Sequence, residues 1–366
     1  MVIIVQQESL RERPRIHKLT KVLEGLGLPF EVWKFRGQHS EQSEAPFIRN
    51  LMTWPRRKLS PALRYLAWMS RVLVAAWTHR RNRHFFAVGF DSALPIALLP
   101  SGNRGFVFDN LDNISLSYRW PSWLRPVVRW LELWVARRSR VHVIPSRQRW
   151  QGASDNLRVV TNTPSATVLT ESRELARKRG YSRGSTMSVY INGWLSATRG
   201  IRTLLEAIPI IEQAGLPLRI IVAGRVGCDD AERLVRLKCV ENLGMLTNEE
   251  ALATYYRCHL AYTYYDPSVA INRIAESQKW TDCWATGTPF ICNSEVETVI
   301  PYVRAGACFT APYADPLALA KLLGELIREP ARLEAARTGI SNMAFKFWDE
   351  EMRKVIEDWL PTAGQS

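Results

Sequence analysis

A lysine and an aspartate three residues apart, Lys279 and Asp282, offer the clearest chemistry in this sequence. The segment 277–285 has a helical pattern, so both side chains are expected on one helix face. Gly287 suits the left-handed residue that ends a helix, and Pro289 then opens a buried strand. A helix N-terminus offers free N–H groups to a diphosphate, while Lys279 adds positive charge and Asp282 can accept from a ribose hydroxyl pair. A surface helix with a chance pair of charges is the alternative interpretation.

Strands and helices alternate along the whole chain, and this order must position the pair. Runs of apolar residues predict strands at 2–5, 30–34, 84–89, 106–108, 141–145, 157–160, 188–192, 218–223, 240–243, 260–264 and 289–292. Helical patterns occur at 13–26, 61–80, 93–99, 123–138, 200–214, 229–238, 248–258, 277–285, 316–327 and 345–360. The charged segment 171–184 is interpreted as a bridge between two sheets. Such alternation predicts parallel sheets whose ligands bind beyond the carboxyl ends of the strands.

The length of 366 residues favours two domains, because one core rarely exceeds ~250–300 residues. The six cysteines are scattered and form no CxxC pair, which argues against a disulfide framework or zinc site and fits a reducing cytoplasm. The apolar start at residues 1–5 is too short for a signal peptide, and no apolar run reaches the ~20 residues of a membrane span. We therefore do not expect an integral membrane protein.

Residues 271–291 resemble the donor-site segment of GT-B glycosyltransferases of the family 4-like group (glycosyltransferase group 1). Lys279, Asp282, Gly287 and Pro289 match, and Gln278 stands where one branch has Asn. Many relatives carry two glutamates eight residues apart, the second of which holds the ribose. Asp282 falls on that second position, whereas the first falls on Ile274, which cannot do that work. The resemblance also places Asn272 among the donor-binding residues.

The resemblance implies an α/β protein of GT-B fold, in which two Rossmann-like domains face a cleft. We expect an N-terminal acceptor-binding domain at 1–160 and a C-terminal domain at 161–344 that binds the nucleotide-sugar donor. A terminal helix within 345–366 is expected to cross back to the first domain. The likeness is loose through residues 1–150 and firmer from about 186 to 325, and the order of its motifs carries it.

The segment 189–201 resembles the strand and glycine turn, here Gly193, that open the donor domain. Relatives often have an arginine just after that glycine and a lysine before a later one, and both cations contact the donor diphosphate. Trp194 takes the first place here, and Arg199 takes the second, where it keeps the charge and can bind phosphate through two N–H groups. Arg225 follows another strand and is a weaker candidate. A solvated surface arginine is the alternative for Arg199.

Polar groups follow two other predicted strands. Asn162 lies in a segment that resembles the turn at the domain junction, where it could line the cleft or simply form the turn. Asp109 and Asp112 follow the strand at 106–108, so they lie at its carboxyl end. Relatives often carry an acid or histidine there, near the acceptor. Asp112 could orient or deprotonate the acceptor hydroxyl, and Asp109 could serve instead, unless both carboxylates only form the turn.

The net charge of +14 is unevenly placed. Residues 45–90 contain nine Lys or Arg and no acid, and residues 119–149 form a second basic stretch with Glu132 as the one acid. Within 49–83, arginines accompany tryptophans and leucines, a composition typical of a helix lying on anionic lipid. This arm predicts peripheral attachment to the inner face of the cytoplasmic membrane. The alternative is an internal helix with a solvated basic edge.

The sequence therefore predicts transfer of a sugar from a nucleotide diphosphate sugar to an acceptor, with a lipid-linked oligosaccharide of cell-surface polysaccharide synthesis preferred. Lys279 and Arg199 would stabilise the leaving diphosphate, without a metal or other cofactor, because no DxD motif is present. The resemblance implies retention of the anomeric configuration. One alternative is a non-catalytic sugar-nucleotide-binding or scaffolding protein of the same fold. A basic nucleic-acid-binding protein is disfavoured, because zinc spacing, RNP-like strands and helix-turn-helix patterns are absent, and we expect no nucleic-acid partner.

Overall fold

A computed structural model describes residues 1–7, 14–36, 46–53, 60–81, 83–100, 105–118, 120–150, 152 and 154–360. The chain forms two compact units, one of residues 1–161 together with 348–366, the other of residues 162–347. The sequence placed the first junction at 160/161 and the second at 344/345. None of the described helices is long and apolar enough to cross a membrane.

The first unit contains a fully parallel seven-stranded sheet in the order β3-β2-β1-β4-β5-β6-β7. Its strands are β1 (Val2–Val5), β2 (Phe30–Arg36), β3 (Ile48–Thr53), β4 (His84–Val88), β5 (Phe106–Asp109), β6 (Val141–Ile144) and β7 (Leu157–Val159). Its helices are α1 (Pro14–Gly25), α2 (Pro61–His79), α3 (Phe90–Ala97), α4 (Ile114–Ser117), α5 (Arg125–Arg138) and α15 (Trp348–Trp359). The central strands β1, β4, β5 and β6 are apolar and buried nearly throughout because helices cover both faces of the sheet.

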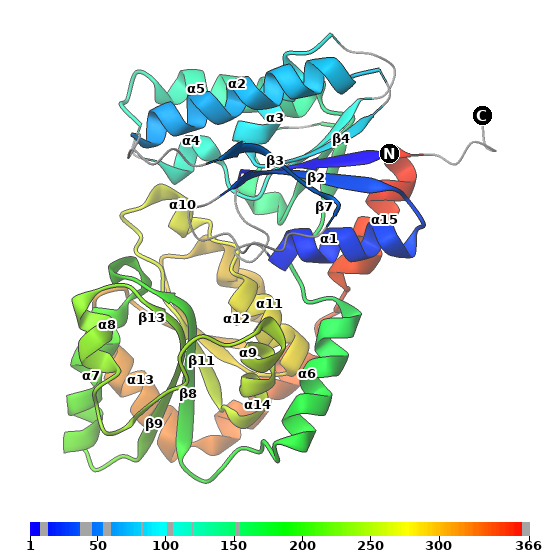
Figure 1. Ribbon diagram of the computed structural model, residues 1–366. Helices are drawn as coiled ribbons and strands as arrows, with labels where there is room; N and C mark the ends of the chain where they lie inside the picture. Colours follow the sequence, from blue (N-terminus) through cyan, green and yellow to red (C-terminus); the bar gives the residue numbers. More distant parts are fainter. Residues whose placement is uncertain are drawn as a thin grey trace. The chain divides into compact units, whose positions relative to one another are not determined.

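Alternate residues of β1 show how the two faces are filled. Ile3 and Val5 belong to the core beneath α2, α3 and α5, whereas Val2 and Ile4 pack with α1 and α15. Figure 1 shows α2 and α5 on one side of this sheet and α1 and α15 on the other. The terminal helix packs against α1 through Trp348, Met352 and Ile356. The predicted return of the chain to its first domain is thus confirmed.

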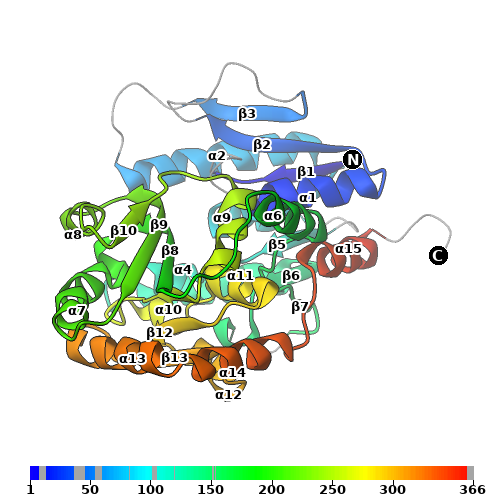
Figure 2. The same cartoon turned by 90° about the horizontal axis from the view of Figure 1, so that it is seen from below.

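The second unit contains a parallel six-stranded sheet in the order β10-β9-β8-β11-β12-β13. The strands are β8 (Met187–Leu195), β9 (Leu218–Val226), β10 (Val240–Asn242), β11 (Leu260–Thr263), β12 (Phe290–Asn293) and β13 (Cys308–Ala311). The helices are α6 (Ala166–Lys178), α7 (Ile201–Gln213), α8 (Asp229–Leu234), α9 (Asn248–Thr254), α10 (Ala270–Arg273), α11 (Gln278–Thr286), α12 (Ile300–Arg304), α13 (Pro316–Arg328) and α14 (Pro330–Ser341). Figure 2 shows α7, α8 and α13 on one side of this sheet and α6, α9 and α11 on the other.

Several segments differ from the sequence prediction. The strand β3 was missed because its sequence, IRNLMT, alternates too weakly to resemble a buried strand, and its pairing with β2 decides its conformation. The charged segment interpreted as a bridge largely belongs to α6, whose Ser165 accepts a hydrogen bond from Val168 N and caps the helix. The strand β13 and helix α14 were also not predicted. The last helix begins at Trp348 rather than at 345.

For helix α2, the side that faces the core differs from the side that the sequence predicts. Leu66, Met69, Leu73 and Trp77 recur at helical spacing along the sequence, which predicts that they form the apolar face of this helix. The structure instead buries Trp68, Val72 and Ala76, spaced four apart, against the sheet. The helix is therefore part of the core of the first unit, while Leu66 and Trp77 remain exposed to solvent.

Candidate functional site

The carboxyl ends of β8 and β9 come unusually close together in the second unit. Gly193 pairs with Gly224 in the register of these strands, and both have positive φ, 93° and 131°. A Cβ on Gly224 would lie 2.0 Å from the carbonyl oxygen of Gly193, so no larger residue fits. The strand ends thus leave exposed backbone at Gly193, where a ligand can approach closely.

Helix α11 carries Lys279 to this strand end. Ser277 caps the helix by accepting a hydrogen bond from Lys279 N at 3.2 Å, and Tyr265 donates its hydroxyl proton to the Ser277 hydroxyl. The lysine Nζ lies 3.5 Å from the position that a Cβ on Gly193 would occupy. The structure therefore brings two predicted donor-binding residues together, 86 positions apart in the sequence (279 − 193).

Arg199 provides a second cation near the start of α11. Its guanidinium stacks on the Tyr265 ring with 4.4 Å between Cζ and the ring centroid. Its Nη1 is buried, and within the described part of the chain this atom has no hydrogen-bond partner. A buried guanidinium N–H without an acceptor is costly, and an anionic oxygen would satisfy it. Tyr265 connects the two cations, since it stacks under Arg199 and holds the cap of the helix that carries Lys279.

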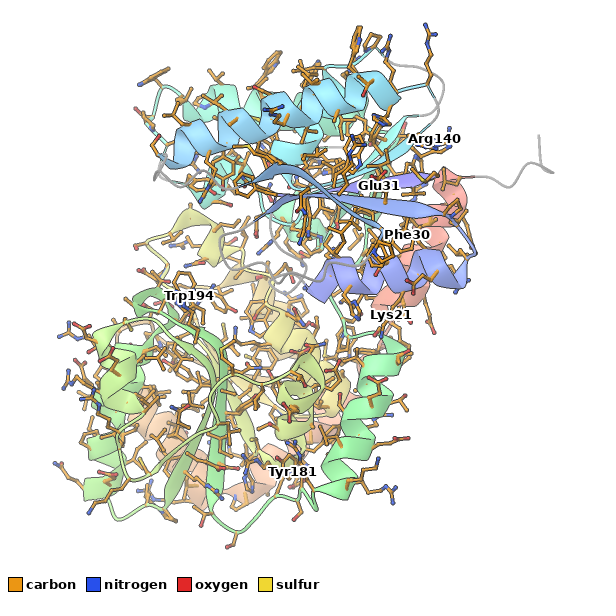
Figure 3. The ribbon with its side chains drawn as sticks, viewed as in Figure 1. Lys21, Phe30, Glu31, Arg140, Tyr181 and Trp194 are labelled. Atoms are coloured by element: carbon orange, nitrogen blue, oxygen red, sulfur yellow. The ribbon has the colours of Figure 1, made fainter. Side chains whose placement is uncertain are left out.

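Trp194 and Arg225 are direct neighbours across β8 and β9. The register pairs them, and the Arg225 guanidinium lies 6.0 Å from the Trp194 ring centroid. The indole is 59% exposed and covers Gly227, where a Cβ would lie 2.1 Å from its Nε1. In Figure 3, Trp194 lies at one end of the second unit and Tyr181 at the opposite end. Arg225 therefore carries positive charge directly beside Trp194, the position at which the family 4-like pattern that the sequence resembles has an arginine.

Asp282 lies one turn after Lys279 and is 9% exposed. Burial raises the pKa of the Tyr190 hydroxyl, and the nearby Asp282 carboxylate adds to this shift. Tyr190 belongs to β8, the strand that also carries Gly193.

The other predicted donor residues make backbone contacts. Asn272 donates from Nδ2 to the Asp266 carbonyl at 2.9 Å, and the Asn162 carbonyl accepts from the Thr281 hydroxyl at 2.9 Å. Ile274 is the half-buried residue that follows α10. These contacts hold in place loops of the second unit that contain or adjoin the predicted donor residues.

The first unit has its own pocket of about 150 Å³ at the carboxyl ends of β1, β4 and β5. Its polar lining comprises Gln6, Gln7, Tyr65, Asp91, Asp112, Ser117 and Tyr118. The hydroxyls of Tyr65 and Tyr118 share a hydrogen bond of 2.8 Å. Amides, hydroxyls, carboxylates and aromatic rings in one small pocket suit a polyhydroxylated ligand.

Asp109 and Asp112 differ sharply in their surroundings. Asp109 is 1% exposed, and both its oxygens accept from Arg15, at 2.8 Å from Nε and 2.8 Å from Nη2. Asp112 lines the pocket, has a side chain 59% exposed, and pairs with Arg149 at 2.9 Å. The geometry therefore assigns Asp109 to a buried ion pair and leaves Asp112 as the carboxylate that can meet a ligand.

Sequence reasoning missed three residues of these sites. Tyr265 lies two residues after the strand that ends at Thr263, and Tyr65 lies on a helix that was considered only as part of a membrane-binding arm. Asp91 follows β4 and lies in the first turn of α3. The rule that ligands bind at the carboxyl ends of parallel strands could have found Tyr265 and Asp91. Among the described residues, no three His, Cys, Asp or Glu side chains come together to hold a metal ion.

Comparison with solved structures identifies the architecture. Sucrose-phosphate synthase from Thermosynechococcus elongatus matches with a TM-score of 0.69 at 13% identity, over 98% of this chain and 98% of that one. Anabaena HepE, solved with UDP and glucose, matches with a TM-score of 0.64 at 14% identity, over 98% and 99%. The chain has the GT-B fold. The predicted fold class is thereby confirmed.

The same fold also occurs in a Listeria monocytogenes protein named for UDP-N-acetylglucosamine 2-epimerase, with a TM-score of 0.62 at 9% identity, over 98% of this chain and 95% of that one. No protein-family model and no curated protein matches the sequence. At these identities the likeness concerns the fold, so the function is argued from the residues of the two sites.

Proposed function

We propose that this protein is a glycosyltransferase that takes a sugar from a nucleotide diphosphate sugar bound to the second unit. The observation that carries the proposal is the buried Nη1 of Arg199, which lies near the N-terminus of α11 and has no acceptor among the described residues. Lys279 adds a second cation at the exposed backbone of Gly193. Two cations, free N–H groups of a helix start and a glycine that permits close approach together suit a diphosphate.

The proposed chemistry depends on stabilising the leaving group. As the bond between the sugar and the diphosphate breaks, negative charge develops on the diphosphate, and Lys279 and Arg199 neutralise it. Asp282 binds the ribose hydroxyls, and Arg225 approaches the phosphates from the neighbouring strand end. We propose that these side chains, rather than a metal ion, carry the neutralising charge. Retention of the anomeric configuration is proposed on the resemblance to family 4-like enzymes.

The acceptor is proposed to bind in the pocket of the first unit, with Asp112 accepting a hydrogen bond from the hydroxyl that attacks. The polar and aromatic lining supports a saccharide acceptor. We propose a lipid-linked saccharide of polysaccharide synthesis, because Tyr65 in this pocket belongs to a helix that exposes leucines and a tryptophan on its outer side. A protein of this kind would work at the surface of a membrane.

The donor site is tested by calorimetric titration of the protein with a panel of nucleotide diphosphate sugars. Arg199→Ala removes a charge-assisted hydrogen bond worth about 1.5–3 kcal/mol, so donor affinity is expected to fall about 10–150-fold. Arg202→Ala is the matched control, because Arg202 lies three residues on, is well exposed and pairs only with Glu206 in the described part of the chain. Equal donor affinity in the two variants would remove Arg199 from the site.

Turnover is tested with Lys279→Ala, which is expected to lower the rate of transfer about 10²–10³-fold while the melting temperature stays unchanged. Lys321→Ala, on the exposed side of α13, is its control. Donor binding without transfer or hydrolysis would favour the non-catalytic alternative. If the protein instead epimerised the sugar of the nucleotide sugar in the absence of an acceptor, its function would be that of a sugar-nucleotide epimerase, the activity in the name of the Listeria protein with this fold, and not glycosyl transfer.

A further inference from the structure

Large apolar side chains exposed to solvent are concentrated in one stretch of the first unit. The described residues include fifteen such side chains, and nine of them lie between residues 63 and 130. These nine are Leu63, Leu66, Val74, Trp77, Leu98, Tyr118, Trp123, Val127 and Trp130. Soluble surfaces normally scatter such residues singly, so this concentration indicates a binding surface.

The exposed residues follow the outer sides of two helices. On and just before α5, Trp123, Val127 and Trp130 are spaced four and three apart and share one helix face. Trp123 is 73% exposed and Trp130 is 61% exposed, whereas Val128, Val135 and Ala136 form the buried side of the helix. The exposed stripe is therefore not needed for the core.

Helix α2 has the same design. Leu63, Leu66 and Trp77 line its outer side, while Trp68 and Val72 pack on the sheet. Helices α2 and α5 cover the same face of the sheet with α3 packed against both, and Figure 1 shows them as its outer layer. We call the exposed apolar side chains on and just before these two helices the α2/α5 surface, which comprises Leu63, Leu66, Val74, Trp77, Trp123, Val127 and Trp130.

The charge around this surface is of one sign. The described part of residues 60–140 contains four acids: Asp91 and Asp112 line the pocket, and Asp109 and Glu132 are buried. Ten arginines lie in the same described part, at positions 64, 71, 80, 81, 83, 125, 129, 137, 138 and 140. One of these guanidinium groups also covers an exposed ring, since Arg80 Cζ lies 3.9 Å from the Trp77 centroid.

We propose that the α2/α5 surface binds an anionic lipid bilayer, with Trp123 and Trp130 inserted at the level of the headgroups. Tryptophan at such an interface places an apolar ring in the lipid and its N–H in the polar layer, while arginines keep their charges among anionic headgroups. The basic rim, with no exposed acid outside the pocket in its described part, favours lipid over a protein partner. The sequence predicted a membrane arm at 49–83. The α2/α5 surface adds α5 to that arm, and it leaves out residues 48–53, which form the edge strand β3.

The position of the pocket fits this arrangement. Tyr65 belongs to α2 and Tyr118 is among the nine exposed residues, and both line the pocket of the first unit. A saccharide attached to a lipid in the bilayer could therefore reach the pocket along the edge of the α2/α5 surface. The lipid proposal itself does not require that the protein transfers sugar.

The test is flotation of the full chain with vesicles of phosphatidylcholine, with and without phosphatidylglycerol. The wild-type protein is expected to float with the anionic vesicles, and a Trp123→Ala, Trp130→Ala double variant is expected to bind at least about tenfold more weakly. A second variant, Arg71→Glu with Arg125→Glu, is expected to lose its binding to the vesicles that contain phosphatidylglycerol, while its behaviour with pure phosphatidylcholine vesicles stays that of the wild type. The matched control replaces Met245 and Leu317, equally exposed apolar residues of the second unit, by alanine and retains full binding.

Donor titration of each variant separates this proposal from the proposed function, because donor affinity should stay at the wild-type value throughout. Absence of wild-type binding to anionic vesicles, or equal binding by the tryptophan variant, overturns the proposal. A wild-type dimer in vesicle-free solution that the tryptophan variant abolishes also overturns it, since the surface would then join two copies of the chain. Flotation of wild type but not of either variant supports it.

Discussion

Replacing Asp109 by asparagine should unfold the first unit at a lower temperature rather than abolish the chemistry. The carboxylate receives two hydrogen bonds of 2.8 Å from Arg15, and the two side chains are 1% and 5% exposed. Arg15 also lies over the Trp348 ring at 5.3 Å, so the pair supports the docking of the terminal helix α15. Asparagine would leave the guanidinium buried without its counter-charge.

Removing one partner of a buried ion pair costs about 3–5 kcal/mol. In a unit of this size each kcal/mol lowers the melting temperature by about 2–4 °C, so Asp109→Asn should lower it by about 6–20 °C. Replacing both partners by apolar residues, Arg15→Met with Asp109→Leu, should recover most of that loss, because no charge then remains buried. Unfolding is followed by near-ultraviolet circular dichroism, and transfer is measured well below the transition.

Asp112→Asn is the matched control. The Asp112 side chain is mostly exposed, and the buried Arg149 keeps its hydrogen bond to the Leu111 carbonyl, so losing the ion pair should change stability by less than about 1 kcal/mol while it lowers transfer. An Asp109→Asn variant that melts like the wild type would refute the reasoning about the buried pair. A variant that melts normally and has lost transfer would instead make Asp109 the catalytic carboxylate.

Three further predictions concern stability and reactivity. Burial lowers the pKa of His142 to about 3, and the positive charge of Arg129 contributes to this shift. Between pH ~6.5 and 3 the unfolded chain therefore binds a proton at this histidine that the folded chain does not, so the free energy of unfolding should fall by about 1.4 kcal/mol for each pH unit that the pH is lowered. Urea titrations at several pH values should show that His142→Phe lacks this contribution. Gly200→Ala should destabilise by more than about 2 kcal/mol, because φ is 64° and the new Cβ would lie 2.5 Å from Tyr264 Cβ, whereas Gly215→Ala, with φ of 67° and open space, should lose only about 1 kcal/mol. Alkylation of the native protein followed by mass spectrometry should modify only the half-buried Cys228 and Cys239, because the other four thiols are buried and out of reach of the reagent. Burial also raises the pKa of Cys239, so Cys228 should react first, and rapid native labelling of the four buried thiols would contradict the packing.

Local spacing determined much of what the sequence could predict about the donor site. The three-residue interval between Lys279 and Asp282, the cap at Ser277 and the glycine at 287 specify a short helix with both charges on one side. These features depend on residues within one or two turns, which the sequence states directly. Alternation of strands and helices likewise fixes parallel sheets, because a chain that returns through a helix brings the next strand back in the same direction.

The partners of these residues depended on contacts between distant segments. Arg15 and Asp109 are 94 residues apart, and only their meeting separates a buried ion pair from a catalytic carboxylate. The register of β8 and β9 places Arg225 beside Trp194, and Tyr265 joins the two cations of the proposed donor site, Arg199 and Lys279. The pattern of α2 was ambiguous because both sides of that helix are apolar. Packing against the sheet chose Trp68 for the core and left Leu66 and Trp77 in solvent, since a helix can bury only the side that its neighbours cover.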